Sequence, residues 1–448
     1  MKIAPAGDRA VLIELGAVSA AELHAKAAEI RLQPDVAACI PGRSSLYVVY
    51  GRHGGEAPMV AAPAIHEITV SFRDDDGPDR SEFLALHDLE LETFLEKVRT
   101  LRLIVRYIGF RGGFGYLDGW PREWAMPRRP TSRPHVAAGT FAIAGDVAGF
   151  YPIDSPGGWN LLGRTGTNLA HALTPGDEIR ILPTLDAIQV VSPQRSSPPD
   201  LAFPLELRNS PLTRLVTAAD WSRTLRGLPP GGPFDDVAAA HANRAAGNAD
   251  DAPLFESALT GPVAIAKRDL VCSWFGAEAE VMVNGVKVAD ARQFEVREGD
   301  EIRAGRIRNG LRGYLAAGDR RGTVAANMRN DRLTIRAIAG PHETSLRSLV
   351  CEVSSELDRV GIRMRLLQPA AVDASATLPS CGMQCGTIQL HPDGSVVAMG
   401  PDHPVTGGYL QPMTVISSER WKLAQLAPGD TVSFRSEESS DSYQSWSP

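Results

Sequence analysis

Arginine, aromatic and glycine residues are concentrated between Gly109 and Thr165 more than in any other part of this 448-residue chain. Arginine presents a rigid fork of donors that suits carboxylate or phosphate, and aromatic rings supply apolar faces that anchor a loop. This combination predicts one wall of a pocket for a small anion. Arg164 is the candidate catalytic residue there, and the candidate substrate-binding residues are Phe110, Phe114, Tyr116, Arg128, Arg129, Arg133 and Trp159.

Each of these residues also has a purely structural interpretation. The sequence SPGGW followed by GRT can form a tight turn, with Trp159 in the core and Arg164 in an ion pair. Arg128, Arg129 and Arg133 can form a solvated basic loop, although the neighbouring prolines favour a fixed presentation. Both interpretations stay open at the level of sequence.

A second polar group lies near the C-terminus, in GTIQLHPDG and DHPVTGGY. Histidine can exchange protons near neutral pH, so His391 and His403 are candidate catalytic residues. Gln389, Thr406 and Tyr409 are candidate substrate-binding residues in the same group. Structural hydrogen bonding explains these side chains about as well.

Several motifs are missing from the sequence, and their absence limits the chemistry that we expect. The chain has no phosphate-binding G-x-x-x-x-G-K-[ST] loop, no H-E-x-x-H, no G-x-S-x-G and no lysine in a biotin-carrying context. Cys381 and Cys385 lack a second pair, so we expect no metal site, and no adjacent base marks Cys381 as a nucleophile. We therefore expect no cofactor in the chain itself; if ATP or carboxybiotin is used, a partner or a pocket without a known motif must supply it.

Composition is that of an ordinary globular protein of two or three domains. Hydrophobic residues make up 43% and charged residues 22%, and no apolar run approaches the ~20 residues that a membrane helix needs. The formal net charge of −7 argues against nucleic acid as a partner. The five dispersed cysteines suit reduced thiols, and the N-terminus lacks a secretory layout, so we expect a cytoplasmic protein.

The pattern of apolar residues predicts a mostly β protein with α+β parts. Ser19 and Glu22 have the spacing of a capping box that starts a helix at Ala20, and short segments after Thr140 have the rhythm of a small β-barrel. A Pro- and Ser-rich stretch at 191–211 is typical of a linker. The segment 343–361 has the spacing of one amphipathic helix, which would place Asp358, Arg359 and Arg363 at its end.

Four segments of the first half resemble a known family: GFRGGFGYL, MPRR, AGTFAIAGDVAGFYP and SPGGWNLLGRT. They are similar to allophanate hydrolase subunit 1, also known as the B subunit of 5-oxoprolinase or the kinase inhibitor KipI. The second half resembles the companion protein, which is called allophanate hydrolase subunit 2, the C subunit of 5-oxoprolinase or KipA. This second resemblance rests on GPFDDVAAAHANRAAGN, RGYLAAG, LDRVGIRM, CGTIQLHPDGSVV, VTGGY and LAQLAPGD. The order of the segments is that of a fusion of the two proteins.

The resemblance implies a small α/β N-terminal domain at 1–75, a cyclophilin-like β-barrel at 76–200, the first part of the C-subunit-like half at 201–340, and a cyclophilin-like part at 341–448. It makes Asp358 a candidate catalytic residue, and Arg359 and Arg363 candidate substrate-binding residues. It also implies either ATP-dependent opening of the lactam 5-oxoproline with a separate subunit, or carboxyl transfer as in the carboxyltransferase region of urea carboxylase.

The leading hypothesis is a 5-oxoprolinase-type amidohydrolase for a small lactam, amide or carboxylated acid, which works with a protein similar to the A subunit of 5-oxoprolinase. Gly109-Phe110-Arg111-Gly112-Gly113-Phe114 replaces the G-F-x-P-G-F of the family, and the segment before AGP is shortened to GDRRGTVAANMRNDR. These departures favour an alternative, a biosynthetic enzyme that performs cyclisation, ring opening or carboxyl transfer without ATP. A non-catalytic, KipI-like binding protein is the third hypothesis. Homo-oligomerisation stays open.

Overall fold

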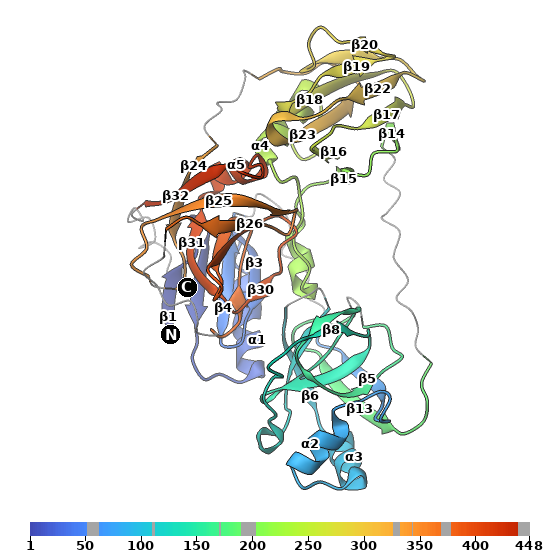
Figure 1. Ribbon diagram of the computed structural model, residues 1–448, viewed down its shortest axis with the longest axis vertical. Coiled ribbons are helices and arrows are strands. Elements are labelled where there is room, and N and C mark those ends of the chain that lie inside the picture. The colour runs from blue at the N-terminus through green and yellow to red at the C-terminus, as the bar shows by residue number, and fades with distance from the viewer. Residues whose placement is uncertain are drawn as a thin grey trace.

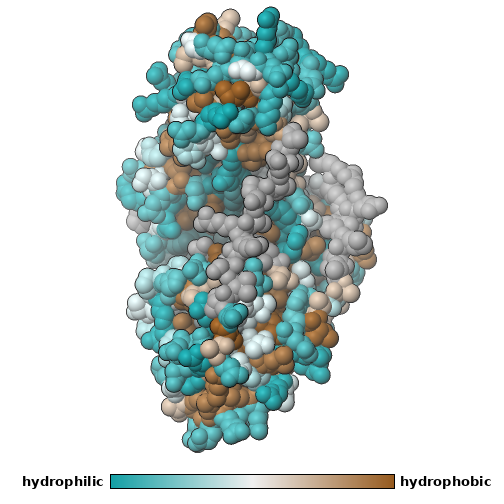
Figure 2. Space-filling model, turned by 90° about the vertical axis from the view of Figure 1, so that its right-hand side faces the viewer, coloured by the Kyte–Doolittle hydropathy of each residue, from teal (hydrophilic) through white to brown (hydrophobic). Residues whose placement is uncertain are grey.

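The computed structural model describes residues 1–51, 62–109, 113–169, 172–189, 203–325, 332–342, 344–368 and 378–437. Figure 1 shows an elongated molecule with the two five-stranded sheets of the second half at one end and the barrel of residues 65–184 towards the other. The N-terminal sheet and the C-terminal barrel lie between them. The face in Figure 2 is predominantly hydrophilic, with hydrophobic residues in separate patches. Among the described residues, no helix is long and apolar enough to cross a membrane.

The N-terminal domain is a four-stranded antiparallel sheet with one helix against it. Its strands have the order β1-β2-β4-β3, and they are β1 (Lys2–Pro5), β2 (Ala10–Glu14), β3 (Val36–Pro41) and β4 (Ser45–Tyr50). The helix α1 (Ala20–Arg31) begins at the expected capping box, because the Ser19 and Glu22 side chains each accept a hydrogen bond from the other's backbone N–H. The predicted helix start is confirmed.

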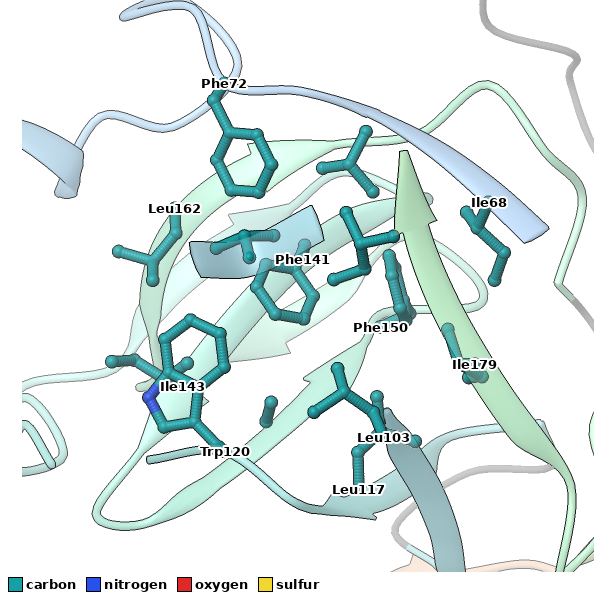
Figure 3. Close-up of a cluster of buried hydrophobic side chains, with 14 of the residues drawn as sticks. Ile68, Phe72, Leu103, Leu117, Trp120, Phe141, Ile143, Phe150, Leu162 and Ile179 are labelled. Carbon is teal, nitrogen blue, oxygen red and sulfur yellow. The ribbon is translucent and has the colours of Figure 1, made fainter. Parts of the chain in front are cut away.

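Residues 65–184 form the first barrel, which is closed by seven described strands in the order β10-β7-β6-β13-β5-β12-β9. These strands are β5 (Ile65–Ser71), β6 (Leu103–Ile108), β7 (Gly115–Asp118), β9 (Thr140–Ala144), β10 (Val147–Phe150), β12 (Asn160–Arg164) and β13 (Glu178–Thr184). Figure 3 shows Phe72, Phe141 and Phe150 among the apolar side chains that fill its interior. The helices α2 (Arg80–Leu86) and α3 (Leu91–Thr100), the short η1 (Arg122–Trp124), and the pair β8 (Arg133–Val136) and β11 (Ser155–Gly157) flank it.

The second half begins with two five-stranded sheets. One contains β14 (Leu205–Arg208), β17 (Val263–Ala266), β22 (Glu301–Ala304), β19 (Val281–Val283) and β20 (Val286–Lys287). The other contains β15 (Thr213–Val216), β16 (Leu254–Ala258), β23 (Arg308–Gly318), β18 (Leu270–Glu278) and β21 (Phe294–Val296). The short η2 (Trp221–Arg226) precedes α4 (Asp236–Ala245), whose apolar face packs on β18 and β23.

A second barrel closes the chain, again with seven described strands, in the order β24-β31-β28-β29-β26-β25-β32. They are β24 (Thr334–Ala339), β25 (Ser348–Leu357), β26 (Gly361–Leu366), β28 (Thr387–Leu390), β29 (Ser395–Met399), β31 (Leu410–Val415) and β32 (Thr431–Glu437). The short pair β27 (Cys381–Gly382) and β30 (Thr406–Gly407) lies outside, and η3 (Ser417–Glu419) and α5 (Arg420–Ala424) precede β32. The predicted mostly β fold with two barrel domains is confirmed.

The prediction of an amphipathic helix at 343–361 is wrong. Ser348–Leu357 form the strand β25, which pairs with β26 and β32. Leu349, Cys351 and Val353 are buried in alternation, and this period of two matches a strand better than a helix. Asp358, Arg359 and Arg363 therefore lie at a turn between two strands and in the strand that follows it.

Two further expectations concern the borders between domains. The strands β5 and β24 both precede the predicted borders at 75 and 340, so each barrel begins earlier than those borders. Most of the predicted linker at 191–211 lies outside the described residues, and β14 occupies part of the remainder.

The N-terminal sheet packs against the second barrel, although the two are far apart in sequence. The Asp8 carboxylate accepts hydrogen bonds from the backbone N–H of Ser417 at 2.9 and 3.0 Å. The Gln384 amide donates to the Ala6 carbonyl at 3.0 Å. Figure 1 shows the two elements side by side. The first and last domains of the described chain are therefore in direct contact, although the other domains separate them in sequence.

Candidate functional site

A cavity of about 650 Å³ lies where three parts of the chain meet, and we call it the junction cavity. The N-terminal domain contributes the loops at 16–19 and 43–44, and the first barrel contributes β6, β7 and the turn at Asp146. Pro379 comes from the second half of the chain. Because two halves line one space, this cavity is the candidate site.

Arginine and aspartate side chains line the junction cavity in pairs. Arg43 donates to Asp146 at 3.0 Å, and Arg106 pairs with Asp118. Arg106 also donates to the backbone carbonyls of Val18 at 2.6 Å and Arg43 at 2.5 Å, so it holds the N-terminal loops against the barrel. Arg43 is 48% exposed and remains able to exchange Asp146 for a ligand carboxylate.

The acidic partner of Arg43 stays charged at neutral pH. Burial raises the pKa of the Asp146 carboxyl, but the hydrogen bond and charge of Arg43 lower it, and the net pKa lies below its usual value. A carboxylate held in this way can accept a hydrogen bond from an amide N–H of a ligand. The cavity thus offers a cationic donor and an anionic acceptor side by side.

Two tyrosines form an aromatic wall of the cavity. The rings of Tyr107 and Tyr116 stack with centroids 4.3 Å apart. Burial raises the pKa of Tyr107 to about 12, against a smaller opposing effect of a hydrogen bond to the Ser380 side chain. Burial likewise raises the pKa of Tyr116. Both phenols are neutral at physiological pH, so they can donate hydrogen bonds but do not act as bases.

The two halves touch directly beside the tyrosines. The Thr406 hydroxyl donates to the Ile108 carbonyl at 3.2 Å. A methyl group on Gly109 would lie 2.1 Å from the same hydroxyl oxygen, so no larger residue fits there. Gly109 does not have a positive φ, and its role is to leave space for Thr406. Thr406, a predicted substrate-binding residue, therefore lies next to the glycine loop.

Tyr116 also belongs to an aromatic cluster with two further predicted residues, Phe114 and Trp159. The ring centroids of Phe114 and Tyr116 are 5.1 Å apart, and Trp159 lies 5.2 Å from Phe114 and 5.6 Å from Tyr116. Arg128 is exposed and lies over Gly158, because a methyl group on Gly158 would be 2.9 Å from its Nε. Phe110 lies outside the described residues.

Arg129, Arg133 and Arg164 hold the barrel together and do not line the junction cavity. Arg129 and Arg133 both bind the buried Asp79 carboxylate, at 3.1 and 2.7 Å. Arg164, at the end of β12, donates from Nε to the Ala138 carbonyl at 3.1 Å. These contacts give the three side chains structural roles, but not the expected ones: Arg129 and Arg133 bind a buried carboxylate and do not form a solvated loop, and the contact of Arg164 is to a backbone carbonyl.

Three members of the polar group in the second half form two contacts. Gln389 lies against Gly407, and His391 lies against Tyr409. The His391 ring stacks on Tyr409 with centroids 4.1 Å apart, and burial followed by the charge of Arg363 lowers the pKa of His391. The Gln389 Nε2 and the His391 Nε2 are buried without a hydrogen-bond partner in the structure. Such atoms are unusual and favour a bound water or ligand.

His403 is fully buried. Its Nδ1 donates to the Pro404 carbonyl at 2.8 Å in the neutral tautomer, and burial lowers the pKa of His403 to about 4. This imidazole is neutral at physiological pH and has no access to the junction cavity. The geometry therefore gives His403 no means to exchange protons with a ligand there.

The three residues at the turn after β25 have partners within the chain. Asp358 accepts hydrogen bonds from the backbone N–H of Val360 and Gly361, as in a tight turn. Arg359 binds Asp402 through two nitrogens at 2.9 Å each and Glu256 at 2.7 Å. Arg363 contacts Glu356 at 3.0 Å and Ser395 at 3.1 Å. This turn joins the second barrel to the sheet domain.

Sequence reasoning missed Arg43, Arg106, Tyr107, Asp118 and Asp146, which line the junction cavity. Arg106 carried a usable signal, because a charged residue in the strand LIVRYI interrupts an apolar run. The other four carried none, since their importance depends on contacts between distant segments.

Metal and thiol chemistry have little support in the described residues. The part of the chain that the structure describes contains no group of three or more His, Cys, Asp or Glu side chains that could hold a metal ion. Burial raises the pKa of Cys381 to about 12 and that of Cys385 to about 11, so both thiols are protonated at neutral pH.

Comparison with protein families gives matches in both halves. Residues 52–173 match the family "Carboxyltransferase domain, subdomain C and D". Residues 226–344 and 320–436 match "Carboxyltransferase domain, subdomain A and B". The two matches follow the division of the chain into two halves.

Curated relatives and solved structures agree with this division. The chain is 31% identical to the B subunit of 5-oxoprolinase from Bacillus subtilis, over 36% of this chain and 80% of that protein. It is 23% identical to the C subunit of 5-oxoprolinase from Haemophilus influenzae, over 45% of this chain and 81% of that protein. The crystal structure of TTHA0988 superposes with a TM-score of 0.81 at 27% identity, covering 96% of this chain and all of that one.

Proposed function

The chain belongs to the carboxyltransferase-domain family that includes the B and C subunits of 5-oxoprolinase, with both parts fused, and we propose that it binds a small lactam, amide or carboxylated acid in the junction cavity. In this proposal it is one component of a 5-oxoprolinase-type amidohydrolase. The observation that carries the proposal is the meeting of both halves at one cavity with a cationic donor and an anionic acceptor.

Five side chains of the cavity have a role in this proposal. Arg43 exchanges Asp146 for the carboxylate of the substrate, and the freed Asp146 accepts the lactam N–H. The phenols of Tyr107 and Tyr116 form the wall and donate hydrogen bonds to the carbonyl oxygen, where negative charge develops when the amide is attacked. Arg106 positions the N-terminal loops.

A partner protein supplies the part of the reaction that this chain does not carry. The relatives of both halves are named as subunits of a larger enzyme, which supports a partner similar to the A subunit of 5-oxoprolinase. In this proposal ATP is bound through that partner. The residues of this chain then bind, orient and shield the substrate.

The test is calorimetric titration of the purified chain with 5-oxoproline, followed by turnover assays with and without ATP and an A-subunit-like protein. Binding together with ATP- and partner-dependent release of glutamate supports the proposal. Turnover without ATP or partner would favour the biosynthetic alternative. A tight protein complex without turnover would favour a KipI-like binding protein, and the absence of any binding of a small acid or lactam would refute the proposed site.

A further inference from the structure

A second cavity, of about 390 Å³, lies wholly within the second half of the chain. It is bounded by β18 and β23 of the sheet domain, by Asp235 at the start of α4, by Trp421 in α5, and by Gln425 directly after α5. We call it the Asp235 cavity. Its lining shares no residue with that of the junction cavity, so the two are separate sites.

The backbone of the sheet is deformed where it borders this cavity. The pairing of β18 with β23 shifts register between Gly276 and Glu278, and Gly276 has a φ of +94°. Opposite this bulge, Asn309 and Gly310 have φ values of +54° and +149°. Bulges of this kind are frequent beside binding sites, because they open a sheet and redirect its side chains.

The side chain of Gln425 binds backbone N–H groups of β23 beside the bulge. Its Oε1 accepts hydrogen bonds from the backbone N–H of Leu311 and Arg312, each at 3.1 Å. Its Nε2 donates to Asp235 Oδ2 at 2.7 Å. These contacts fix the Asp235 carboxyl at the edge of the cavity.

Asp235 is 1% exposed, and in the described part of the chain its carboxyl forms no ion pair. Its side-chain contacts are with the backbone N–H of Ala238 at 2.8 Å and with Gln425, and both donors are uncharged. The nearby carboxylate Glu256, by contrast, is paired with Arg359. Asp235 is the N-cap of α4, and burial without a cation disfavours its ionised form, so a cationic group beside it would favour the carboxylate and be held by it.

Charges of both signs line the Asp235 cavity. Glu278 is exposed at its edge, and Arg292 and Arg332 also line it. The aromatic side chains of Trp274 and Trp421 complete the lining, and indole rings attract cationic groups. A ligand with a single negative charge would meet two carboxyl groups, whereas a zwitterion matches both sets of charges.

We infer that the Asp235 cavity binds a small free amino acid, with its ammonium group at Asp235 and its carboxylate at Arg292 and Arg332. The ammonium group supplies the counter-ion that Asp235 lacks. The carboxylate competes with Asp290 for Arg292, whose ion pair is 2.9 Å long and exposed. It competes with Asp430 for Arg332, whose contacts with that carboxylate are 3.3 Å long. The volume holds a molecule of this size together with a few water molecules. This inference does not depend on the reaction at the junction cavity.

The inference also predicts a pH dependence of binding. Burial raises the pKa of Asp235 to about 7, hydrogen bonds from Ala238 and Gln425 oppose this, and the negative charges of Asp236 and Glu256 add to it. Arg312 and Tyr314 on β23 also face this network. An ammonium group prefers the ionised carboxyl, so affinity should rise as the pH increases from 6 to 8.

The experiment is calorimetric titration of the intact chain with glycine, glutamate and lysine, and with their N-acetyl forms, which lack the ammonium charge. At least one free amino acid should bind, with its N-acetyl form about tenfold weaker or more. Asp235→Asn keeps the helix cap and should weaken binding about tenfold. Asp236→Asn, which changes the adjacent carboxyl outside the cavity lining, should retain binding.

Three results would overturn the inference: no binding of the three free amino acids at millimolar concentration, equal affinity for free and N-acetylated forms, or unchanged affinity in folded Asp235→Asn. Should Asp235→Asn fail to fold, Arg292→Gln at the exposed edge takes its place. This variant should weaken binding of the free amino acid several-fold. Unchanged affinity in Arg292→Gln would then contradict the assigned position of the carboxylate.

Discussion

The two barrels of this chain have the same topology but differ at the corresponding connection. If β5, β6, β7, β9, β10, β12 and β13 are matched in chain order to β24, β25, β26, β28, β29, β31 and β32, the circular strand orders are identical. In each barrel the first and last strands pair in parallel. The connection from β6 to β7 therefore corresponds to the turn from β25 to β26.

One of these corresponding connections borders a cavity, and the other is bound to a neighbouring domain. In the first barrel, the strands on either side of the connection supply Arg106, Tyr107 and Tyr116 to an open cavity. In the second barrel, Arg359 in the turn is saturated by Asp402, Glu256 and the Gly232 carbonyl. One barrel topology thus carries a candidate binding site in one copy and a connection between domains in the other. The two connections differ because Glu256 and Gly232, from another domain, bind the second one.

The largest expected effect is at the closed turn. Arg359→Ala removes the closest cation from the buried Glu256 and leaves Asp402 paired with Arg214, and should lower the free energy of unfolding by about 3 to 5 kcal/mol. Arg365→Ala in the same barrel removes an exposed pair with Glu352, and should cost about 0 to 1 kcal/mol. Urea denaturation measures both. Equal losses would mean that the turn does not lock the domains together.

The next prediction concerns the pH dependence of stability through His403. Its pKa is lowered from 6.5 to about 4 in the folded chain, so the unfolded chain binds the extra proton first. Neutral His403 therefore contributes its full share to the free energy of unfolding above pH 6.5. This contribution falls by about 3 kcal/mol as the pH decreases towards 4. His403→Gln should flatten this part of the curve. Parallel curves for both proteins would show that His403 titrates freely, which would revive its catalytic role.

A smaller effect is expected where the open connection meets the second half. Gly109→Ala places a methyl group against the Thr406 hydroxyl, and should destabilise the chain by about 1 to 3 kcal/mol. Thr406→Ala in the same chain should restore part of the loss. Gly305→Ala is the matched control, because a methyl group there is 3.5 Å from its nearest neighbour and no positive φ is involved. An additive double mutant would contradict the contact between the halves.

The smallest expected effect compares Arg43, which lines the junction cavity, with Arg164, which the sequence favoured as the catalytic residue. Arg43→Ala should weaken binding of 5-oxoproline about tenfold, because it removes the exchangeable cation. Arg164→Ala should leave that affinity unchanged, since Arg164 lies outside the cavity lining and contacts Ala138. Calorimetric titration measures both affinities. The reverse result would move the site to the far strand of the barrel.

Local features of the fold could be predicted from sequence where a short segment carries its own cause. The capping box at Ser19 and Glu22 starts α1 as expected. The segment 343–361 misled because its apolar spacing also fits a strand, and pairing with β26 and β32 decided between the two. Neither partner strand is visible in the local pattern.

For the site, the sequence alone determined the residue types and the family, and thereby placed Tyr116, Phe114 and Trp159 in one neighbourhood. Only the tertiary structure decided which arginines are available to a ligand. Arg129, Arg133 and Arg359 are bound to buried carboxylates, whereas the ion pair of Arg43 with Asp146 is exposed at the junction cavity. The physical reason is that a cation's availability depends on which carboxylate folds against it, and those partners come from segments far away in the chain.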